Sequence, residues 1–427
     1  MKNEKNIKIN SLILLFSILP ISIIIGSSFS LTNTVLLSLC FVFIYFSKSN
    51  FKINDFKPIL FLIILYFYLI FNSLVSVDIT SGIYRNFGFV RFIFFFLIVN
   101  YIFFIHEKNS NILKTWTTIF FVVLIDVYIE RFTGSNILGF GKLEIDGVPQ
   151  PYANRVISFF KTEPIAGAYL CGFSFIVSGY ILEFFKSKKI LKILGFVIIL
   201  LILVGIILTG ERSNGLKALI GFIIFISIID YVKLKSKILI FLSVFTIFFL
   251  TISFSDYVKY RYVDQFYSEI KTKEKRENFL ENSLYIKLYK SGIYVFKNNP
   301  WLGVGNKNYR VETCDTKKNS IHKEYLCLTH PHQVYIEMLS EHGIIGTIIV
   351  LSIIFYLMFR IIGKIIYSRN YVQAGCLTFL LTNFVPLLPS GAFFNNFNIT
   401  LFMINFSLMY AVNKETNIFS KKNDISI

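Results

Sequence analysis

The sequence contains little cysteine and no evident internal repeat. The chain has five cysteines in 427 residues, and no two of them form a Cys-x-x-Cys pair. This excludes a scaffold held mainly by disulfides and gives no cysteine pair for a structural zinc site. The missing repeat argues against a transporter built from two similar halves.

Charged residues are also scarce. They make up 16% of the chain, whereas hydrophobic residues make up 55% and aromatic residues 18%. An ordinary soluble domain does not have this composition. The net charge of +18 would suggest a nucleic-acid partner in a soluble chain. Here Lys and Arg fall mainly in short clusters between apolar runs, which is typical of cytoplasmic membrane loops. We therefore expect membrane lipids, and no nucleic acid, as partners.

Apolar runs recur along the whole chain. A helix needs about 17 to 25 apolar residues to cross the hydrocarbon core. The candidate spans are 11–27, 31–46, 58–77, 87–105, 116–128, 165–185, 190–208, 216–232, 238–254, 343–362, 376–388 and 399–412. The sequence thus predicts an all-α polytopic membrane protein with about 12 transmembrane helices, forming a single integral-membrane domain over 1–427.

One long connector, 255–332, separates two of these spans. The basic connectors alternate regularly, which predicts cytoplasmic termini and a periplasmic location for this loop. Its first half mixes charges with apolar residues at helical spacing, and its second half contains the turn formers Pro300, Gly303 and Gly305. We expect a small helical cap that leads into the next membrane helix.

Four of the five histidines lie between Trp301 and Val350. The sequence His330-Pro331-His332-Gln333 is suited to begin a helix, because proline is favoured at the first helical position. Glu337 follows one turn later, on the same face as Gln333. A histidine at such a place is a candidate general base, because its unperturbed pKa is close to neutrality. The alternatives are that His330 and His332 only cap and anchor the helix, or that both bind a metal with Glu337, for which spacing fixes no third ligand.

These residues resemble the bacterial O-antigen ligase and O-antigen polymerase superfamily. Ligases of this kind carry a histidine followed by Asn, Ser or Gln, then nine residues, a Gly, two residues and a small residue; His332, Gln333, Gly343 and Gly346 fit this pattern. Asn is commoner than Gln at the second position. Supporting segments are NPWLGVGNKNYR, TGERSNGLKAL with its Arg-x-x-x-Leu element, and RVISFFKTEPIAGAYL. The resemblance extends from residue 155 to residue 396.

The resemblance implies a metal-independent, inverting glycosyltransferase of lipopolysaccharide biosynthesis in the cell envelope. Such an enzyme lies in the bacterial inner membrane, with its active site facing the periplasm. Its donor is a glycan on undecaprenyl diphosphate, and it uses no cofactor. An O-antigen ligase moves the glycan to lipid A-core, and we favour this version. The alternatives are an O-antigen polymerase with a second lipid-linked glycan as acceptor, a protein O-oligosaccharyltransferase, and a lipid-glycan flippase.

The resemblance also suggests roles for individual residues. His332 and Glu337 are the catalytic candidates, and Arg212, Arg91 and Arg155 are the candidates for binding the donor diphosphate.

Each arginine has the alternative of extending its charge to lipid headgroups. Glu163 and His330 are possible acceptor-orienting residues; Glu163 alternatively caps a helix start or pairs with Arg155.

Cys314 and Cys327 are the only cysteines outside the predicted spans, on the side predicted to be oxidising. We expect a disulfide between them, stabilising the cap by about 3 kcal/mol in the chain-entropy model. Two free buried thiols are the alternative.

Overall fold

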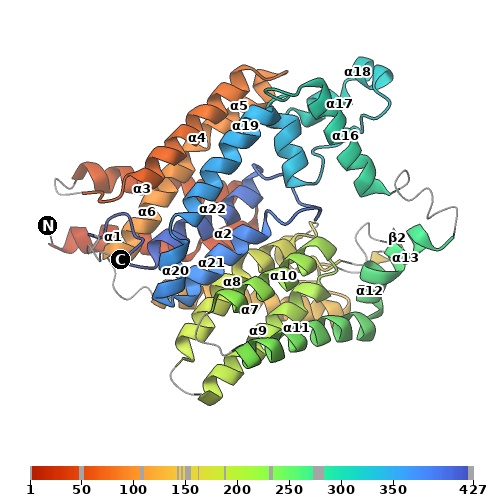
Figure 1. The fold of residues 1–427 in the computed structure, drawn as a ribbon. Coiled ribbons are helices and arrows are strands. Elements are labelled where there is room, and N and C mark those ends of the chain that lie inside the picture. Colours follow the sequence, from red (N-terminus) through yellow and green to blue (C-terminus); the bar gives the residue numbers. More distant parts are fainter. Residues whose placement is uncertain are drawn as a thin grey trace.

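The computed structural model of the chain describes residues 2–47, 52–105, 110–141, 144–145, 148–149, 155–161, 163–186, 189–229, 234–272 and 283–421. This part is almost entirely helical (Figure 1). A two-residue antiparallel pair, β1 (Glu144–Ile145) with β2 (Val148–Pro149), is its only sheet. The helical elements before it are α1 (Lys2–Ser17), α2 (Leu19–Ile25), α3 (Ser27–Ser47), α4 (Lys57–Leu74), α5 (Ile79–Phe87), α6 (Val90–Ile105) and α7 (Ser110–Thr133).

The elements after it contain the long connector and the last spans. They are η1 (Ser158–Phe160), α8 (Ala166–Phe184), α9 (Lys189–Leu208), α10 (Arg212–Ile228), α11 (Leu234–Phe254), α12 (Asp256–Lys259), η2 (Tyr260–Asp264), α13 (Gln265–Ile270), α16 (Leu284–Asn298), α17 (Tyr309–Cys314), α18 (Thr316–Ile321), α19 (Val334–Phe359), α20 (Ile362–Ser368), α21 (Tyr371–Thr382) and α22 (Asn396–Ala411).

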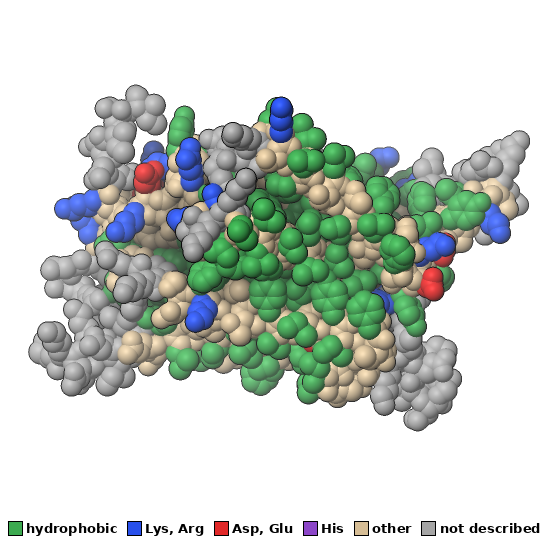
Figure 2. Space-filling model, turned by 90° about the horizontal axis from the view of Figure 1, so that it is seen from below, with side chains coloured by type: hydrophobic (Ala, Val, Ile, Leu, Met, Phe, Trp, Pro, Cys, Tyr) green, Lys and Arg blue, Asp and Glu red, His purple; other side chains and the backbone are tan. Residues whose placement is uncertain are grey.

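Seven helical stretches in the described part are long and apolar enough to cross a membrane. They begin at residues 57, 79, 110, 166, 190, 234 and 334 and coincide with seven predicted spans. The other five predicted spans overlap helices, including the shorter apolar stretches Ser27–Phe43 and Tyr371–Thr382. The predicted span 376–388 is helical only as far as Thr382, and residues 230–232 of the span 216–232 lie outside the described residues. Figure 2 shows hydrophobic side chains across the middle of one face and most Lys and Arg toward its two ends. The chain is a multi-pass membrane protein, and the count of twelve spans stays a prediction.

The helices α8, α21 and α22 form the centre of the molecule. In the apolar stretch of α8, 78% of the residues are buried, compared with 17% in that of α11. Glycines allow α8 and α21 to approach closely: a Cβ on Gly375 would lie 2.1 Å from the Phe175 carbonyl oxygen, and one on Gly179 would lie 2.4 Å from that of Tyr371. Small residues serve this purpose in membrane helix packing.

The helix α19 is interrupted at Gly343, which has φ 62° and ψ −171°. The loop that precedes α17 enters the break and replaces the lost helical hydrogen bonds. Val304 N donates to the Ser340 carbonyl (3.0 Å), and Ile344 N donates to the Pro300 carbonyl (2.8 Å). The two sequence motifs WLGVGN and His-Gln-x9-Gly-x2-Gly are thus joined by backbone hydrogen bonds at the break in α19.

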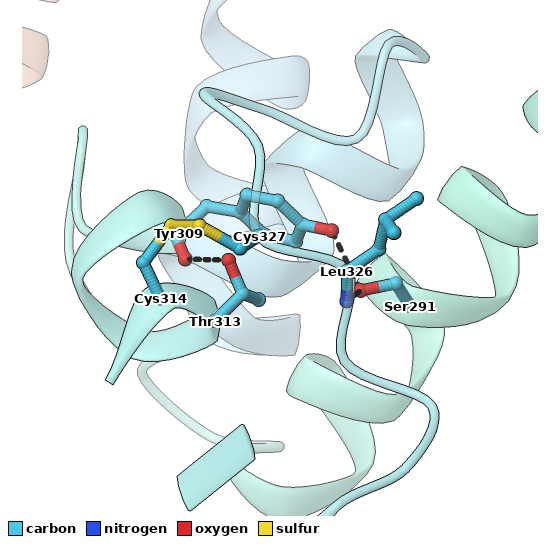
Figure 3. The surroundings of a disulfide bond; sticks show 6 residues. All are labelled: Ser291, Tyr309, Thr313, Cys314, Leu326 and Cys327. Atoms are coloured by element: carbon cyan, nitrogen blue, oxygen red, sulfur yellow. Dashed lines mark hydrogen bonds between the residues drawn. A yellow bond between two sulfur atoms is a disulfide. The ribbon is translucent and has the colours of Figure 1, made fainter. Parts of the chain in front are cut away.

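The helical cap, consisting of α16, α17, α18 and their connecting loops, lies beside the first part of α19 (Figure 1). Cys314 and Cys327 form a disulfide there, with their Cα atoms 4.5 Å apart (Figure 3). Ser291 on α16 bonds both to the Tyr309 hydroxyl (2.7 Å) and to the Leu326 N–H (2.9 Å). These bonds tie the disulfide loop to α16. The cysteines Cys40, Cys171 and Cys376 are free.

Candidate active site

A cavity with a volume of about 660 Å³ lies between two groups of helices. In Figure 1, α5, α16 and α19 lie in the upper half of the molecule and α10, α12 and α13 in the lower half. Part of the lining is apolar, including Ile165, Phe379 and Leu401. The titratable lining residues are Arg85, Arg155, Glu163, Glu211, Arg212, Lys217, Arg261, Tyr285, His332 and Cys171. Its size is within the usual range of ligand pockets, about 300 to 1,000 Å³.

His332 lies at the cavity in an unusual backbone conformation, with φ 57°. Its carbonyl accepts a hydrogen bond from the Ser390 N–H (2.8 Å), and its ring lies against those of His330 and Tyr285, with centroid distances of 3.9 and 6.4 Å. Burial lowers the pKa of His332. The neutral imidazole therefore predominates at neutral pH and is able to accept a proton.

Gln333 explains the second position of the histidine motif. Its side-chain oxygen accepts a hydrogen bond from the Ile336 N–H (2.9 Å) and so caps the first turn of α19. Asn is a stronger helix cap than Gln, but here the longer side chain reaches the same N–H group. The cap fixes where α19 begins and therefore where His332 lies.

His330 does not line the cavity. Its Nε2 lies 3.3 Å from the Ser390 carbonyl and its Nδ1 lies 2.9 Å from the Thr329 hydroxyl. Burial, and then the neighbouring His332, lower the pKa of His330 to about 4. The ring supports His332 and the loop that contains Ser390.

Glu337 is buried on α19 and also lies outside the cavity lining. Both of its carboxylate oxygens accept from the Phe393 N–H, at 3.0 and 3.1 Å. Because Phe393 lines the cavity, Glu337 positions the cavity wall rather than facing the cavity.

The cavity is lined by four cations, Arg155, Arg212, Lys217 and Arg261, which we call the cation wall. Arg155 is placed there by its neighbour Val156, whose N–H donates to the Thr209 carbonyl (2.9 Å). Arg212 begins α10, and within the described residues its guanidinium forms no hydrogen bond or ion pair.

Arg261 lies on η2, and its Nε donates to the Gly210 carbonyl (3.2 Å). Burial, and then the like charges of Arg155 and Arg212, lower the pKa of Arg261 to about 10. Several cations placed so close together are costly unless an anion lies among them.

Two acids also reach the cavity. Glu211 accepts from the Gly167 N–H (2.5 Å) and from the Asn214 amide (2.7 Å), so it caps the start of α8. Burial raises the pKa of Glu211 to about 7, while these hydrogen bonds and the charge of Arg155 oppose the rise. Glu163 is an exposed residue at the cavity edge, just before α8.

Arg91 does not line the cavity. Its guanidinium donates to the Gly88 carbonyl (2.7 Å) and to the Asn396 side-chain oxygen (2.8 Å), and it lies 4.3 Å from the Phe92 ring centroid. Because Asn396 does line the cavity, Arg91 acts on the site by positioning this amide.

Of the residues predicted for the site, His332, Arg155, Arg212 and Glu163 therefore lie together in the cavity. Sequence reasoning did not assign Arg261, Lys217, Glu211, Tyr285 or Arg85 to the site. A lysine 9% exposed inside an apolar helix, such as Lys217, was the available signal; Arg261 gave no comparable signal. No group of three or more His, Cys, Asp or Glu residues in the described part is arranged to bind a metal.

No curated protein matches the chain. Residues 196–351 match the family described as O-Antigen ligase. The match runs from α9 to α19 and includes Arg212, Lys217, Arg261 and His332. Through this region, the chain is similar to the O-antigen ligase family.

Proposed function

We propose that this protein transfers a glycan from undecaprenyl diphosphate to an acceptor at the periplasmic face of the inner membrane, as an O-antigen ligase. One observation carries this proposal: a single cavity is lined both by His332 and by the cation wall. Binding of a lipid-linked diphosphate needs fixed cations near the membrane surface, and one arginine side chain can bind two phosphate oxygens at once. Transfer to a hydroxyl group also needs a base that can accept the hydroxyl proton, and a histidine does so only as the neutral ring.

In the proposed reaction, a His332 ring nitrogen takes the proton of the acceptor hydroxyl. The acceptor oxygen forms a bond to the anomeric carbon, and the bond from that carbon to the diphosphate oxygen breaks with its electron pair. Negative charge therefore grows on the departing undecaprenyl diphosphate. The cation wall stabilises this charge more in the transition state than in the bound donor. Inversion at the anomeric carbon follows from a single displacement.

Replacement of His332 tests the base. A general base contributes about 10²- to 10⁴-fold in rate, so His332→Ala should remain folded and lose nearly all transfer. The measurement is the transfer rate of purified full-length protein in detergent. The matched control is His322→Ala, because the His322 ring packs on Tyr325 in the cap (4.7 Å) and lies outside the cavity. A His332→Ala protein with normal activity at normal abundance would refute the assignment.

A cellular experiment separates ligase from polymerase. Deletion of a ligase should remove all polymer from lipid A-core and leave lipid-linked polymer to accumulate. Deletion of a polymerase should leave lipopolysaccharide with a single repeat. Glycan missing from secreted proteins instead would identify a protein O-oligosaccharyltransferase, and purified protein without any transfer activity would favour a flippase.

A further inference from the structure

Arg85, on α5, lines the cavity but does not belong to the cation wall. Arg85 lies on a helix whose Gly82 and Asn86 contact the loop at the α19 break, whereas Arg212 begins α10 and Arg261 bonds to Gly210 just before it. In Figure 1, α5 lies in the upper half of the molecule and α10 in the lower half. The cavity is therefore lined by cations from two groups of helices, and Arg85 comes from the group that contains α19, which begins just after His332.

Glu337 and Glu341, two buried carboxylates of α19, already accept hydrogen bonds from backbone N–H groups. Glu337 accepts from the Phe393 N–H (3.0 Å), and Glu341 accepts from the Tyr309 N–H (3.2 Å). Arg85 itself forms no hydrogen bond or ion pair with the residues that the structure describes. Its guanidinium donors are thus available to a ligand in the cavity.

The position of Arg85 is fixed by its helix. The preceding turn is pressed against the loop at the α19 break: a Cβ on Gly82 would lie 2.6 Å from the Asn306 carbonyl oxygen. The next residue, Asn86, donates to the Leu69 carbonyl (2.7 Å) and accepts from the Asn306 amide (2.5 Å). The same loop therefore contacts both the helix that carries Arg85 and the break of α19.

The proposed displacement reaction suggests that Arg85 acts on the acceptor. In an inverting reaction, the acceptor oxygen enters on the side of the anomeric carbon opposite the leaving diphosphate. With the diphosphate on the cation wall, the acceptor lies on the side of His332 and Arg85. We infer, on the basis of the proposed function, that Arg85 binds a phosphate group of the acceptor and thereby helps to place its hydroxyl at His332.

A guanidinium fork binds phosphate in a bidentate manner, so this site selects a phosphorylated acceptor. The phosphate has two possible sources. One is the phosphorylated core oligosaccharide of lipid A-core, and the other is the diphosphate of a second lipid-linked glycan.

Binding without turnover tests the inference on the purified full-length protein. The probes are undecaprenyl diphosphate, phosphorylated core oligosaccharide, and the same oligosaccharide dephosphorylated with hydrofluoric acid. The variants are Arg85→Gln, Arg85→Lys and Arg212→Gln, with Arg310→Gln as the matched control, because Arg310 is exposed on α17 outside the cavity. Thermal unfolding reports whether each variant is folded, and Arg85→Lys serves if Arg85→Gln does not fold.

Two results support the inference and distinguish the sources. If the core carries the phosphate, Arg85→Gln should weaken binding of the phosphorylated core about 10- to 100-fold, and dephosphorylation should remove this difference. If a lipid-linked glycan carries it, wild type should bind two equivalents of undecaprenyl diphosphate, one sensitive to Arg85→Gln and the other to Arg212→Gln. Arg85→Lys should be impaired less than Arg85→Gln in either case.

Two results would overturn it. Unchanged binding of every probe by Arg85→Gln would mean that Arg85 only balances Glu337 and Glu341. A single undecaprenyl diphosphate equivalent, weakened by both variants, would move Arg85 to the donor. Arg85-dependent phosphate binding by a wild-type protein that transfers no glycan would instead refute the proposed function and leave the phosphate site standing.

Discussion

His332 and Arg212 differ in how firmly the chain holds them. His332 has a left-handed backbone and a carbonyl bonded to Ser390, and its ring lies against His330. The Arg212 side chain forms no such bond within the described part. The base is therefore prearranged for proton transfer, whereas the guanidinium is available to the departing diphosphate.

Arg212 provides a prediction about charge and shape. Lysine keeps the charge but loses the planar fork that binds two phosphate oxygens, so Arg212→Lys should be impaired and Arg212→Ala more so. A charge-assisted hydrogen bond contributes about 1.5 to 3 kcal/mol, so we expect a rate loss of about 10- to 100-fold for alanine. The measurement is the transfer rate at saturating donor and matched protein level. Wild-type rates from both variants would place Arg212 at lipid headgroups instead.

The pH dependence of transfer is a second prediction for single residues. Burial lowers the pKa of His332 below its ordinary value, and only the neutral ring accepts a proton. Activity should therefore be complete above the ordinary histidine pKa of about 6.5 and fall only at lower pH. Glu211, with a pKa raised to about 7, titrates nearby. If the acidic fall in kcat/KM persists in Glu211→Gln, it belongs to His332; its disappearance would assign it to Glu211.

Among the structural elements, the broken helix α19 determines the site most directly. Its first part carries the Gln333 cap and Glu337, and its break receives the loop that also fixes α5. The histidine-to-glycine spacing in the sequence corresponds to the distance from the cap to the break. The second glycine of the motif, Gly346, is needed because a Cβ at this position would lie only 1.7 Å from the Tyr68 hydroxyl oxygen.

Replacement of Gly343 tests this junction. Alanine at φ 62° costs about 1 to 2 kcal/mol, and its Cβ would also lie 2.4 Å from the Trp301 backbone. We expect Gly343→Ala to lower the thermal unfolding midpoint and the transfer rate together. The control is Gly363→Ala on α20, where a Cβ has no neighbour within 4 Å. Equal stability of the two variants would show that the break tolerates a side chain.

For the whole molecule, the membrane orientation decides whether the cavity is available to a periplasmic donor. The basic connectors predict that 255–332 is periplasmic. Lys271 is exposed in this segment, whereas Lys235 lies at the start of α11 on the predicted cytoplasmic side. In a variant without the three free cysteines, an impermeant thiol reagent should label Lys271→Cys in cells with a permeabilised outer membrane, and Lys235→Cys only after lysis. The reverse pattern would invert the topology and rule out a periplasmic transferase.

The sequence alone determined the features that depend on local order. Apolar length fixed where helices lie, since membrane helices satisfy their backbone groups within one segment. The positions of Gln333, Gly343 and Gly346 marked the helix that begins just after His332. Arg212 was identifiable as a site candidate because it lies in a short turn between two predicted spans, which is also a local feature of the sequence.

Only the tertiary structure decided which charged side chains share the cavity. Arg91 and Glu337 resembled site residues in sequence, but their polar atoms bind Asn396 and Phe393 N–H instead. Arg261 and Arg85 come from segments far apart in the chain and lie at one cavity. A burial pattern shows that a cation or carboxylate needs a partner, but it does not name the partner. That choice depends on how helices distant in sequence pack together.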